Sequence, residues 1–527
     1  MSTQTIDTPT ETTKPKPRSL LRSSGVFASM TFISRITGFM RDMIWAQVFG
    51  VTASMDAFMV AFRIPNFMRR LFAEGAFSQA FIPVLAEYHG TRTLEETRSF
   101  ISRVSGTLGS ALLVVTIICM LATPLIVTLF APGFSTGGHR YELASQLLRI
   151  TFPYLFFISL AAMAGAVLNT FGSFALAAFA PVLLNVALIS AAFFGNAYLK
   201  EPVTALSWGV FAAGILQLLF LLPALSKRHL LVKPTMDWRG PEVKRVMKLM
   251  LPALFGVSVG QINLFVDTLF ASYLPVGSIQ WLYYSDRLMN FPLGVFGVAI
   301  ATVILPSLSK QHADQSPERF SLALDWGVRM VLLLGVPSAI GIAWLSLPLL
   351  ATLFAHGNFT ATDVIQTQKS LIAFSLGIPF FMLIKVLASG FYARHNITTP
   401  VRIGVISMIV NTVLILLFIS PLKHGGLALA TTLAAVVNSG LLFLLLKYRD
   451  EWRPNPGWIR FFLQLLISLS VMSAWLYYWS SPVDTWLQWS STIRTAHLLF
   501  QTVTAMILFL LALQLSGFRW SSIRHVT

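Results

Sequence analysis

The segment DAFMVAFRIPNFMRRLFAEGAFSQAFIP, which runs from Asp56 to Pro83, decides how this chain folds. It is too apolar for a helix on the surface of a soluble protein, and Pro65 and Gly75 can bend it along its course. Placing an Arg or Asp at the centre of a bilayer costs about 2.5–3.5 kcal/mol, so charged residues there line a cavity or pair with each other. Five such residues interrupt this segment: Asp56, Arg63, Arg69, Arg70 and Glu74.

The composition of the whole chain indicates a membrane protein. Of its 527 residues, 55% are hydrophobic and 11% are charged, and the mean hydropathy is +0.71. These values predict many membrane spans rather than one soluble core. The net charge of +17 does not indicate a nucleic-acid partner, because the basic residues do not gather on one domain among aromatic residues. A single cysteine, Cys119, excludes an internal disulfide.

Apolar runs of about 20 residues, the length that crosses a bilayer, recur along the chain. Long continuous runs predict helices, since a barrel would show short alternating strands. The expected fold class is therefore all-α and polytopic, with 14 transmembrane helices. They are predicted at 25–48, 55–87, 102–130, 143–170, 175–196, 203–226, 246–274, 279–307, 327–354, 364–392, 400–420, 425–446, 458–480 and 496–517.

Lys and Arg outside these spans favour one side of the membrane. That side receives the N-terminal tail, the loops 227–245 and 447–460, and the C-terminal residues. The opposite side has little beyond Arg140, Lys200, Lys423 and Arg494. Because cytoplasmic loops carry the excess of Lys and Arg, both termini are predicted to be cytoplasmic, which requires an even number of spans.

An internal repeat divides the chain. PLIVTLFAPG, from Pro124 to Gly133, recurs 224 residues later as PLLATLFAHG, from Pro348 to Gly357. Nearly the same spacing separates Arg63 and Arg287, Pro83 and Pro306, and Asn185 and Asn411. Two six-helix copies then share one orientation, and a substrate site is expected between them near the bilayer midplane. The predicted division is a disordered cytoplasmic tail (1–24), an N-lobe (25–232), a C-lobe (233–452) and two extra helices with the C-terminal tail (453–527).

The intramembrane cations predict a site for an anion. Arg63 and Arg287 are equivalent in the repeat, so they are expected to face each other across the pseudo-twofold axis as a clamp. Guanidinium forks match phosphate oxygens well. The alternative is an ion-pair ladder that only holds helices together, with the acids Asp42, Asp56, Glu74 and Asp286 as partners or gating groups. The predicted substrate-binding residues are Arg35, Arg41, Arg63, Arg69 and Arg287.

A second polar group predicts a site for a coupling ion. Asp267 lies one turn after Asn263, and Asn411 and Thr431 come from two later spans. Carboxylate, amide and hydroxyl oxygens suit Na⁺ or a proton relay. Hydrogen bonding between helices is the alternative. No other cofactor and no certain metal site is expected.

The sequence gives no support for an enzyme. It contains no G-x-x-x-x-G-K-[ST], H-E-x-x-H or G-x-S-x-G motif, and its nine His are scattered singly. We therefore expect no catalytic residues.

Three strings carry a family resemblance: SRITGFMRD (34–42), PNFMRRLFAEGAFSQAFIP (65–83) and WLYYSDRLMNFPLGVFGVAIATVILP (281–306). They resemble the MurJ (MviN) lipid II flippases of bacteria, in the two-lobed multidrug/oligosaccharidyl-lipid/polysaccharide exporter superfamily. The resemblance covers the chain from about Leu20. It implies alternating-access transport of an undecaprenyl-diphosphate-linked disaccharide-pentapeptide, a peptidoglycan precursor, from the inner to the outer leaflet of the bacterial inner membrane. The alternative is a cation-coupled exporter of drugs or of other lipid-linked oligosaccharides. The excess of Arg argues against a drug exporter, whose cavity would be dominated by apolar and acidic residues.

The resemblance also implies roles for particular residues. Some members have a sodium site in the helices that correspond to Asp267 and Asn411. Relatives often carry an acid where this chain has Asn290, so Asp286 or Glu74 would have to serve in any acid-based gating. The last two spans are candidates for a groove that holds the lipid tail. The charged cavity positions of the family match Arg35, Arg41, Asp56, Arg69 and Arg287.

The predicted orientation can be tested with single cysteines in a Cys119→Ala background. Cysteines at Gly137 and Ser480 should react with an impermeant thiol reagent from outside the cell, because their loops lie on the side poor in Lys and Arg. A cysteine at Thr235 should react only after the membrane is permeabilised. Labelling of Thr235 in intact cells would reverse the predicted orientation.

Overall fold

The computed structural model describes residues 17–134, 137–448, 452–454 and 456–519. Within these ranges the chain is helical throughout, without a β-strand. Ten of the described helices are long and apolar enough to cross a membrane. The predicted class of an all-α polytopic membrane protein is therefore confirmed.

The first ten helical segments follow the first six predicted spans. The first helix begins at Pro17, inside the stretch expected as a tail, and residues 1–16 lie outside the described part. The segments are α1 (Pro17–Phe49), α2 (Ala53–Met68), η1 (Arg69–Phe77), α3 (Ser78–Thr91), α4 (Leu94–Leu121), α5 (Thr123–Phe130), α6 (His139–Thr151), α7 (Pro153–Thr170), α8 (Phe174–Tyr198) and α9 (Val203–Lys227).

The second half of the chain repeats this layout and adds a hairpin. Its segments are α10 (Pro241–Ser272), α11 (Ser278–Pro292), η2 (Leu293–Gly297), α12 (Val298–Ala313), α13 (Pro317–Leu353), α14 (Ala361–Ser375), α15 (Ile378–Tyr392), α16 (Thr398–Tyr448), α17 (Trp458–Tyr478), α18 (Val483–Gln488) and α19 (Ser491–Leu515). Inside α16, Lys423 has φ 50° and ψ −130°, which no helix permits. α16 is therefore two helices joined by a sharp kink.

Two wide helical turns of the π type support the internal repeat. η1 begins at Arg69 and η2 at Leu293, which are 224 residues apart, the spacing found in the sequence. Each follows a proline, Pro65 or Pro292, and each contains glycine. Such bulges are frequent at functional sites, because they redirect side chains within an otherwise regular helix. The bend expected in the opening segment is thus a π-helical turn.

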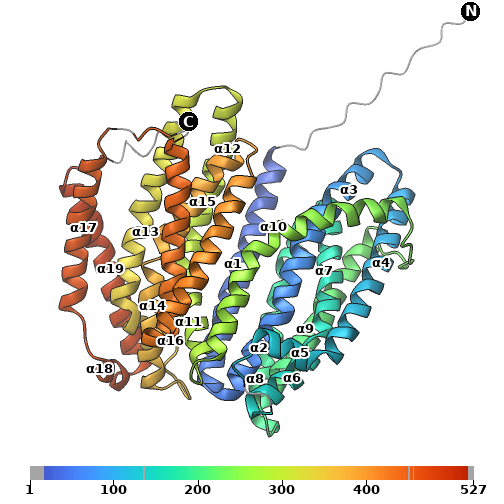
Figure 1. Ribbon diagram of the computed structural model, residues 1–527, viewed down its shortest axis with the longest axis horizontal. Coiled ribbons are helices and arrows are strands. Elements are labelled where there is room, and N and C mark those ends of the chain that lie inside the picture. The colour runs from blue at the N-terminus through green and yellow to red at the C-terminus, as the bar shows by residue number, and fades with distance from the viewer. Residues whose placement is uncertain (1–16, 135–136, 449–451, 455, 520–527) are drawn as a thin grey trace, which may run out of the picture.

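Helices α1 to α9 pack into one bundle and α11 to α16 into another, as Figure 1 shows. α10 crosses between the bundles, since it packs against η1 and α3 of the first and against α16 of the second. The first bundle is held by contacts of α8 with α1 and α9 and of α2 with α6. Any site between the bundles is therefore bordered by α1, α2, α10 and α11.

The hairpin α17–α19 lies against α13, on the side away from the first bundle (Figure 1). At one end the buried guanidinium of Arg494 donates to the carbonyl oxygens of Ala351 (3.0 Å) and Ala355 (2.9 Å), at the end of α13. At the other end the indole of Trp458 donates to Asp325 of α13 over 2.8 Å. Carbonyls at a helix C-terminus have no partner within the helix, so a cation there is favourable. The hairpin is thus fixed to α13 at both ends.

Candidate functional site

A fully buried carboxylate, Asp42 of α1, lies at the centre of the charged site. One of its oxygens accepts hydrogen bonds from Arg41 (2.6 Å) and from the Tyr283 hydroxyl (2.9 Å). The other forms an ion pair with Nε of Arg287 over 2.7 Å. Tyr283 and Arg287 belong to α11 in the opposite bundle. Asp42 therefore links the two bundles.

The guanidinium of Arg41 is held from several sides. Besides Asp42 it donates to the Tyr283 hydroxyl (2.9 Å) and to the amide oxygen of Asn185 on α8 (3.1 Å). It also lies 4.5 Å from the ring centroid of Trp45, a cation–π contact. Gly38 allows the close packing here, because a Cβ at that position would lie 2.7 Å from a guanidinium nitrogen of Arg287. This part of the site is preorganised.

Arg63 and Arg287, the two arginines of the predicted clamp, each contact groups of the opposite half of the molecule. Arg63 donates to the hydroxyl of Thr268 on α10 over 3.0 Å. Arg287 is paired with Asp42 rather than with its neighbour Asp286. Both arginines thus reach toward the opposite half of the molecule, and each already interacts with groups there.

Asp56, expected as a cavity acid, is buried and ties two segments together. One carboxylate oxygen accepts the backbone N–H of Gly277 (2.7 Å), and the other accepts the amide of Gln280 (3.0 Å). The same amide also donates to the carbonyl of Thr52 over 2.8 Å. Gly277 is the N-cap of α11, so the negative charge lies where the helix dipole favours it. Asp56 therefore anchors the start of α11.

The other predicted charges lie toward the opposite end of the site. Arg35 is exposed and abuts η2, because a Cβ on Gly294 would collide with its guanidinium. Arg69 is half-buried at the start of η1, with its Nε 3.4 Å from Asn66 Oδ1. The side chain of Glu74 lies outside the described residues. Arg35 thus borders the space next to η2.

The predicted ion-coupling residues lie partly together. The amide of Asn411 lies 3.4 Å from a carboxylate oxygen of Asp267, which joins α10 to α16. The amide oxygens of Asn411 and Asn263 are buried without a described hydrogen-bond partner. The Thr431 hydroxyl donates to its own helix at Leu427. The described residues contain no cluster of three or more His, Cys, Asp or Glu.

Sequence reasoning missed three contributors to this site. Gln280 holds Asp56, Asn185 orients Arg41, and Lys385 adds an ammonium in the middle of α15. Lys385 carried a usable signal, since an ionisable residue within an apolar span is a functional candidate by default. Asn185 carried one too, since it is equivalent in the repeat to the predicted site residue Asn411. Gln280 carried none, because its role depends on a contact between distant segments.

Two loops, which contain Gly133 and Asn358, close one end of the space between the bundles. We call their contacts with α10 and α1 the seam. The backbone N–H of Asn358 donates to the carbonyl of Gln47 at the end of α1 over 3.0 Å. The backbone N–H of Gly133 donates to the Ser272 hydroxyl at the end of α10 over 2.9 Å. A Cβ on Gly133 would collide with the backbone at Ser272, and one on Gly357 with the backbone of Gln47. The two repeated motifs therefore end in glycines that each allow one loop to touch the first helix of the other half.

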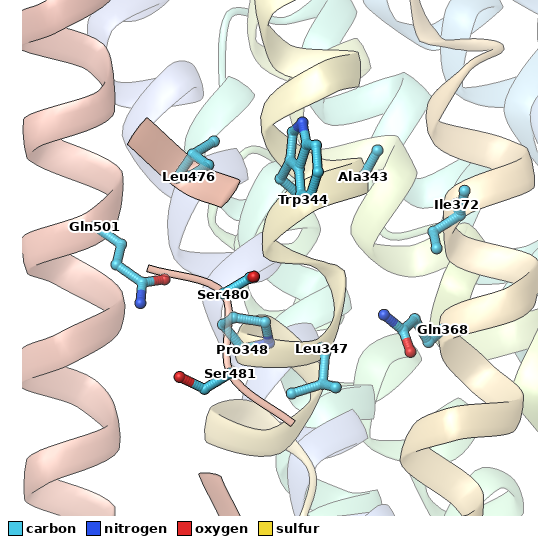
Figure 2. Close-up of a pocket in the computed structure, with 10 residues that line it drawn as sticks. All are labelled: Ala343, Trp344, Leu347, Pro348, Gln368, Ile372, Leu476, Ser480, Ser481 and Gln501. Atoms are coloured by element: carbon cyan, nitrogen blue, oxygen red, sulfur yellow. The ribbon is translucent and has the colours of Figure 1, made fainter. Parts of the chain in front are cut away.

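A cavity of about 350 Å³ lies apart from these charges, between α13, α14, α17 and α19. Figure 2 shows Trp344 and Leu347 of α13, Gln368 of α14 and Gln501 of α19 around it. None of its lining residues is charged, so it does not suit an anionic head group. The lipid-tail groove expected at the last two spans stays a prediction.

Comparisons with known proteins agree on one family. The family model described as "Lipid II flippase MurJ" matches residues 45–497. The chain is 47% identical to the probable lipid II flippase MurJ of Haemophilus influenzae, over 93% of this chain and 98% of that protein. It is 44% identical to the lipid II flippase MurJ of Burkholderia cenocepacia, over 89% and 91%.

Solved structures give the same result. A lipid II flippase MurJ in an inward closed conformation matches with a TM-score of 0.77 and 29% identity, over 92% of this chain and 97% of that one. An inward-facing multidrug transporter of the MATE family matches with a TM-score of 0.66 and 15% identity, over 80% and 97%. The second similarity concerns the fold alone.

The Asp42 site predicts which acid matters for stability. Asp42→Asn should lower the free energy of unfolding by about 3–5 kcal/mol, because two guanidinium groups lose a buried partner. Asp286→Asn should cost less than about 1 kcal/mol, since none of the described cations lies within ion-pair distance of Asp286. Thermal unfolding of both purified variants checks this. Equal losses would mean that Asp286 carries as much of the pairing as Asp42.

Proposed function

Because the chain belongs to the MurJ family of lipid II flippases, we propose that it moves lipid II from the inner to the outer leaflet of the bacterial inner membrane by alternating access. The observation that carries the proposal is the set of arginines where the two bundles meet. A diphosphate is a strong anion, and guanidinium groups bind phosphate oxygens through paired hydrogen bonds. Membership of the family indicates the substrate, and the arginines of this site provide the hydrogen-bond donors that its diphosphate needs.

We also propose fourteen spans with both termini in the cytoplasm. Ten helices meet the length and hydropathy of a span. Treating the kinked α16 as two helices and adding α1, α10 and the continuous segment α2–η1–α3 gives fourteen. The loops that form the seam then lie on the outer side, where Lys and Arg are few.

The arrangement supports an inward-facing state. The described hydrogen bonds and ion pairs between α1–α9 and α11–α16 involve residues 41–56 of the first bundle, near its outer end. Toward the inner end, α10 packs against the first bundle, as in the 2.7 Å ion pair between Arg245 and Glu87. Contact between the bundles is thus concentrated at the outer side, which leaves the inner side for substrate entry.

The Asp42 link offers a way to couple substrate binding to opening. A diphosphate that bonds Arg287 and Arg41 competes with Asp42 for the same guanidinium groups. A ligand shifts a conformational equilibrium only by binding one state better than the other. Since the Asp42–Arg287 ion pair joins the bundles, its exchange for substrate contacts weakens the outer closure. Gly38 and Asn185 then act as positioning residues.

Transport by the purified protein in vesicles tests the function. Labelled lipid II should reach the opposite leaflet, and a cationic drug should not accumulate. Arg287→Lys should reduce transport and Arg287→Ala should reduce it further at equal abundance, because Lys lacks the planar fork. Drug transport without lipid II transport would favour the exporter alternative.

We propose that Asp267 and Asn411 couple transport to Na⁺ or protons. Their support is a carboxylate beside an amide oxygen that is buried without a described donor. Asp267→Asn should lower lipid II transport and remove its dependence on an imposed Na⁺ or pH gradient. Unchanged gradient dependence in this variant would leave the pair as an interhelical hydrogen bond.

The glycines of the seam predict a shift toward the outward-facing state. Gly133→Ala and Gly357→Ala should each destabilise the closed seam by about 1–3 kcal/mol, because the added methyl meets backbone. A cysteine at the buried Ala46, in a Cys119→Ala background, should then react with an impermeant thiol reagent at least about fivefold faster.

Gly341→Ala and Gly440→Ala are matched controls, since a Cβ at either position meets no atom within 4 Å. Both should label at the wild-type rate. If the seam variants label no faster than these controls, the contacts at Gly133 and Gly357 do not close the outer side.

A further inference from the structure

The cavity of about 350 Å³ between α13, α14, α17 and α19 lies outside the space between the two bundles. This volume falls at the lower end of the range for small-molecule sites, so it suits one compact group. Part of its lining is apolar, and none of it is charged. Its polar lining consists of two amides and two hydroxyls: Gln368, Gln501, Ser480 and Ser481.

Gln501 of α19 is only 3% exposed, and the orientation of its amide is fixed. The amide nitrogen donates to the carbonyl oxygen of Trp479 over 3.2 Å. Because a carbonyl can only accept, the nitrogen must be the atom on that side. The amide oxygen is left without a donor among the described residues. Gln501 therefore presents an acceptor, and Figure 2 shows its oxygen on the side of the cavity.

Gln368 of α14 is fixed in the same way on the opposite wall. Its amide nitrogen donates to the Ser346 hydroxyl over 3.2 Å. That hydroxyl already donates its own hydrogen to the carbonyl of Ala343 over 2.8 Å, so toward Gln368 it can only accept. The amide oxygen of Gln368 again has no donor within the described part of the chain. Two oriented amides thus border one cavity from α14 and α19, as Figure 2 shows.

An aromatic ring and a proline form an apolar wall of the cavity. The indole of Trp344 packs edge-on against Tyr477, with the ring centroids 5.8 Å apart, which holds the indole in place. Pro348, one turn later on α13, continues this wall. A flat apolar surface beside hydrogen-bonding groups matches a ligand that has an apolar face and polar groups around its edge.

Three classes of ligand do not fit this lining. An anion finds no cation in it. A hydrocarbon chain would cover the two amide oxygens without giving them a hydrogen bond, which is unfavourable. The ester groups of a phospholipid only accept hydrogen bonds, so they cannot serve these oxygens either. A ligand that fits is uncharged and carries hydrogen-bond donors.

We propose that this cavity binds one uncharged sugar unit on the outer side of the membrane. A sugar ring has hydroxyl donors around its edge and C–H groups on its faces, so it donates to Gln368 and Gln501 while one face lies on Trp344. The sugar belongs to a lipid-linked saccharide or to a free one, since both offer the same groups. The inference goes beyond the proposed function, and only the outer position of the cavity rests on that proposal, through the loop that contains Ser480 and Ser481.

The test measures binding of a disaccharide of N-acetylglucosamine to the purified full chain in nanodiscs, by saturation-transfer NMR. Gln501→Leu and Gln368→Leu should each weaken binding at least about fivefold, because each removes one acceptor at similar volume. Trp344→Leu should weaken it as well, because the flat wall is lost.

Gln464→Leu is the matched control. Gln464 of α17 is also a buried amide, and it donates to the carbonyl of Ser516 over 3.0 Å, outside the cavity. This variant should bind the disaccharide as wild type does. Absence of saturable binding by wild type would overturn the proposal, and so would equal losses in Gln464→Leu and the two cavity variants.

A cysteine at Ser481, in a Cys119→Ala background, tests the location of the site. It should react with an impermeant thiol reagent from outside the cell, and the disaccharide should slow this reaction at least about threefold. A cysteine at Gly137, in another loop of the outer side, should react at the same rate with and without the sugar. Reaction of Ser481→Cys only after permeabilisation would overturn the outer position.

Lipid II transport in vesicles identifies the source of the sugar once binding is established. Slower transport by Gln501→Leu would assign the sugar to the transported lipid, and unchanged transport would assign it to a free saccharide. A wild-type protein that binds the disaccharide but does not move lipid II would refute the proposed function and leave the sugar site standing.

Discussion

The bilayer's low tolerance for unbalanced charge is the constraint on which the rest of this structure depends. Asp42 satisfies this constraint because its carboxylate pairs with both Arg41 and Arg287. Since Arg287 belongs to the other bundle, the same pairing also joins the two halves of the molecule. A permanent hydrophobic contact at this point would hold the bundles closed in any state. An ion pair can exchange partners, so the same interaction that stabilises the closed side can yield to an anionic ligand.

The internal repeat explains why the contacts of the seam and the polar residues of the site occur in equivalent pairs, one in each half of the chain. Gly133 and Gly357 end the two copies of one motif, and each lets its loop touch the first helix of the other half. Asp42 and Asp267 likewise occupy the first helices of the two halves, with Asn185 and Asn411 beside them. The halves have diverged in the charge that each Asp meets. Asp42 holds two arginines directly, whereas Asp267 contacts an amide, which leaves it open to a different partner.

The sequence predicted the helices well and the pairing of charges poorly, for physical reasons. Span positions depend on local hydrophobicity, so 203–226 was close to the observed Val203–Lys227. Arg287 was expected to face Arg63 as part of a clamp, with Asp286 among the acids that could pair with the arginines in the alternative. Its partner in the structure is Asp42, 245 residues earlier in the chain, because successive residues on a helix point in different directions. Residues that pair across the interface between the bundles leave no periodic pattern in the sequence.

The attachment of the hairpin α17–α19 determines how it travels during a conformational cycle. Arg494 fixes one end of it to α13 and Trp458 the other, and Figure 1 places it beyond the second bundle from the first. The hairpin must then move as one rigid body with the second bundle. Anything bound in the cavity between α13 and α19 would stay still in that bundle's frame of reference while the first bundle rotates. The cavity therefore keeps its shape and its distance from α13 throughout the cycle, whatever happens to the space between the two bundles.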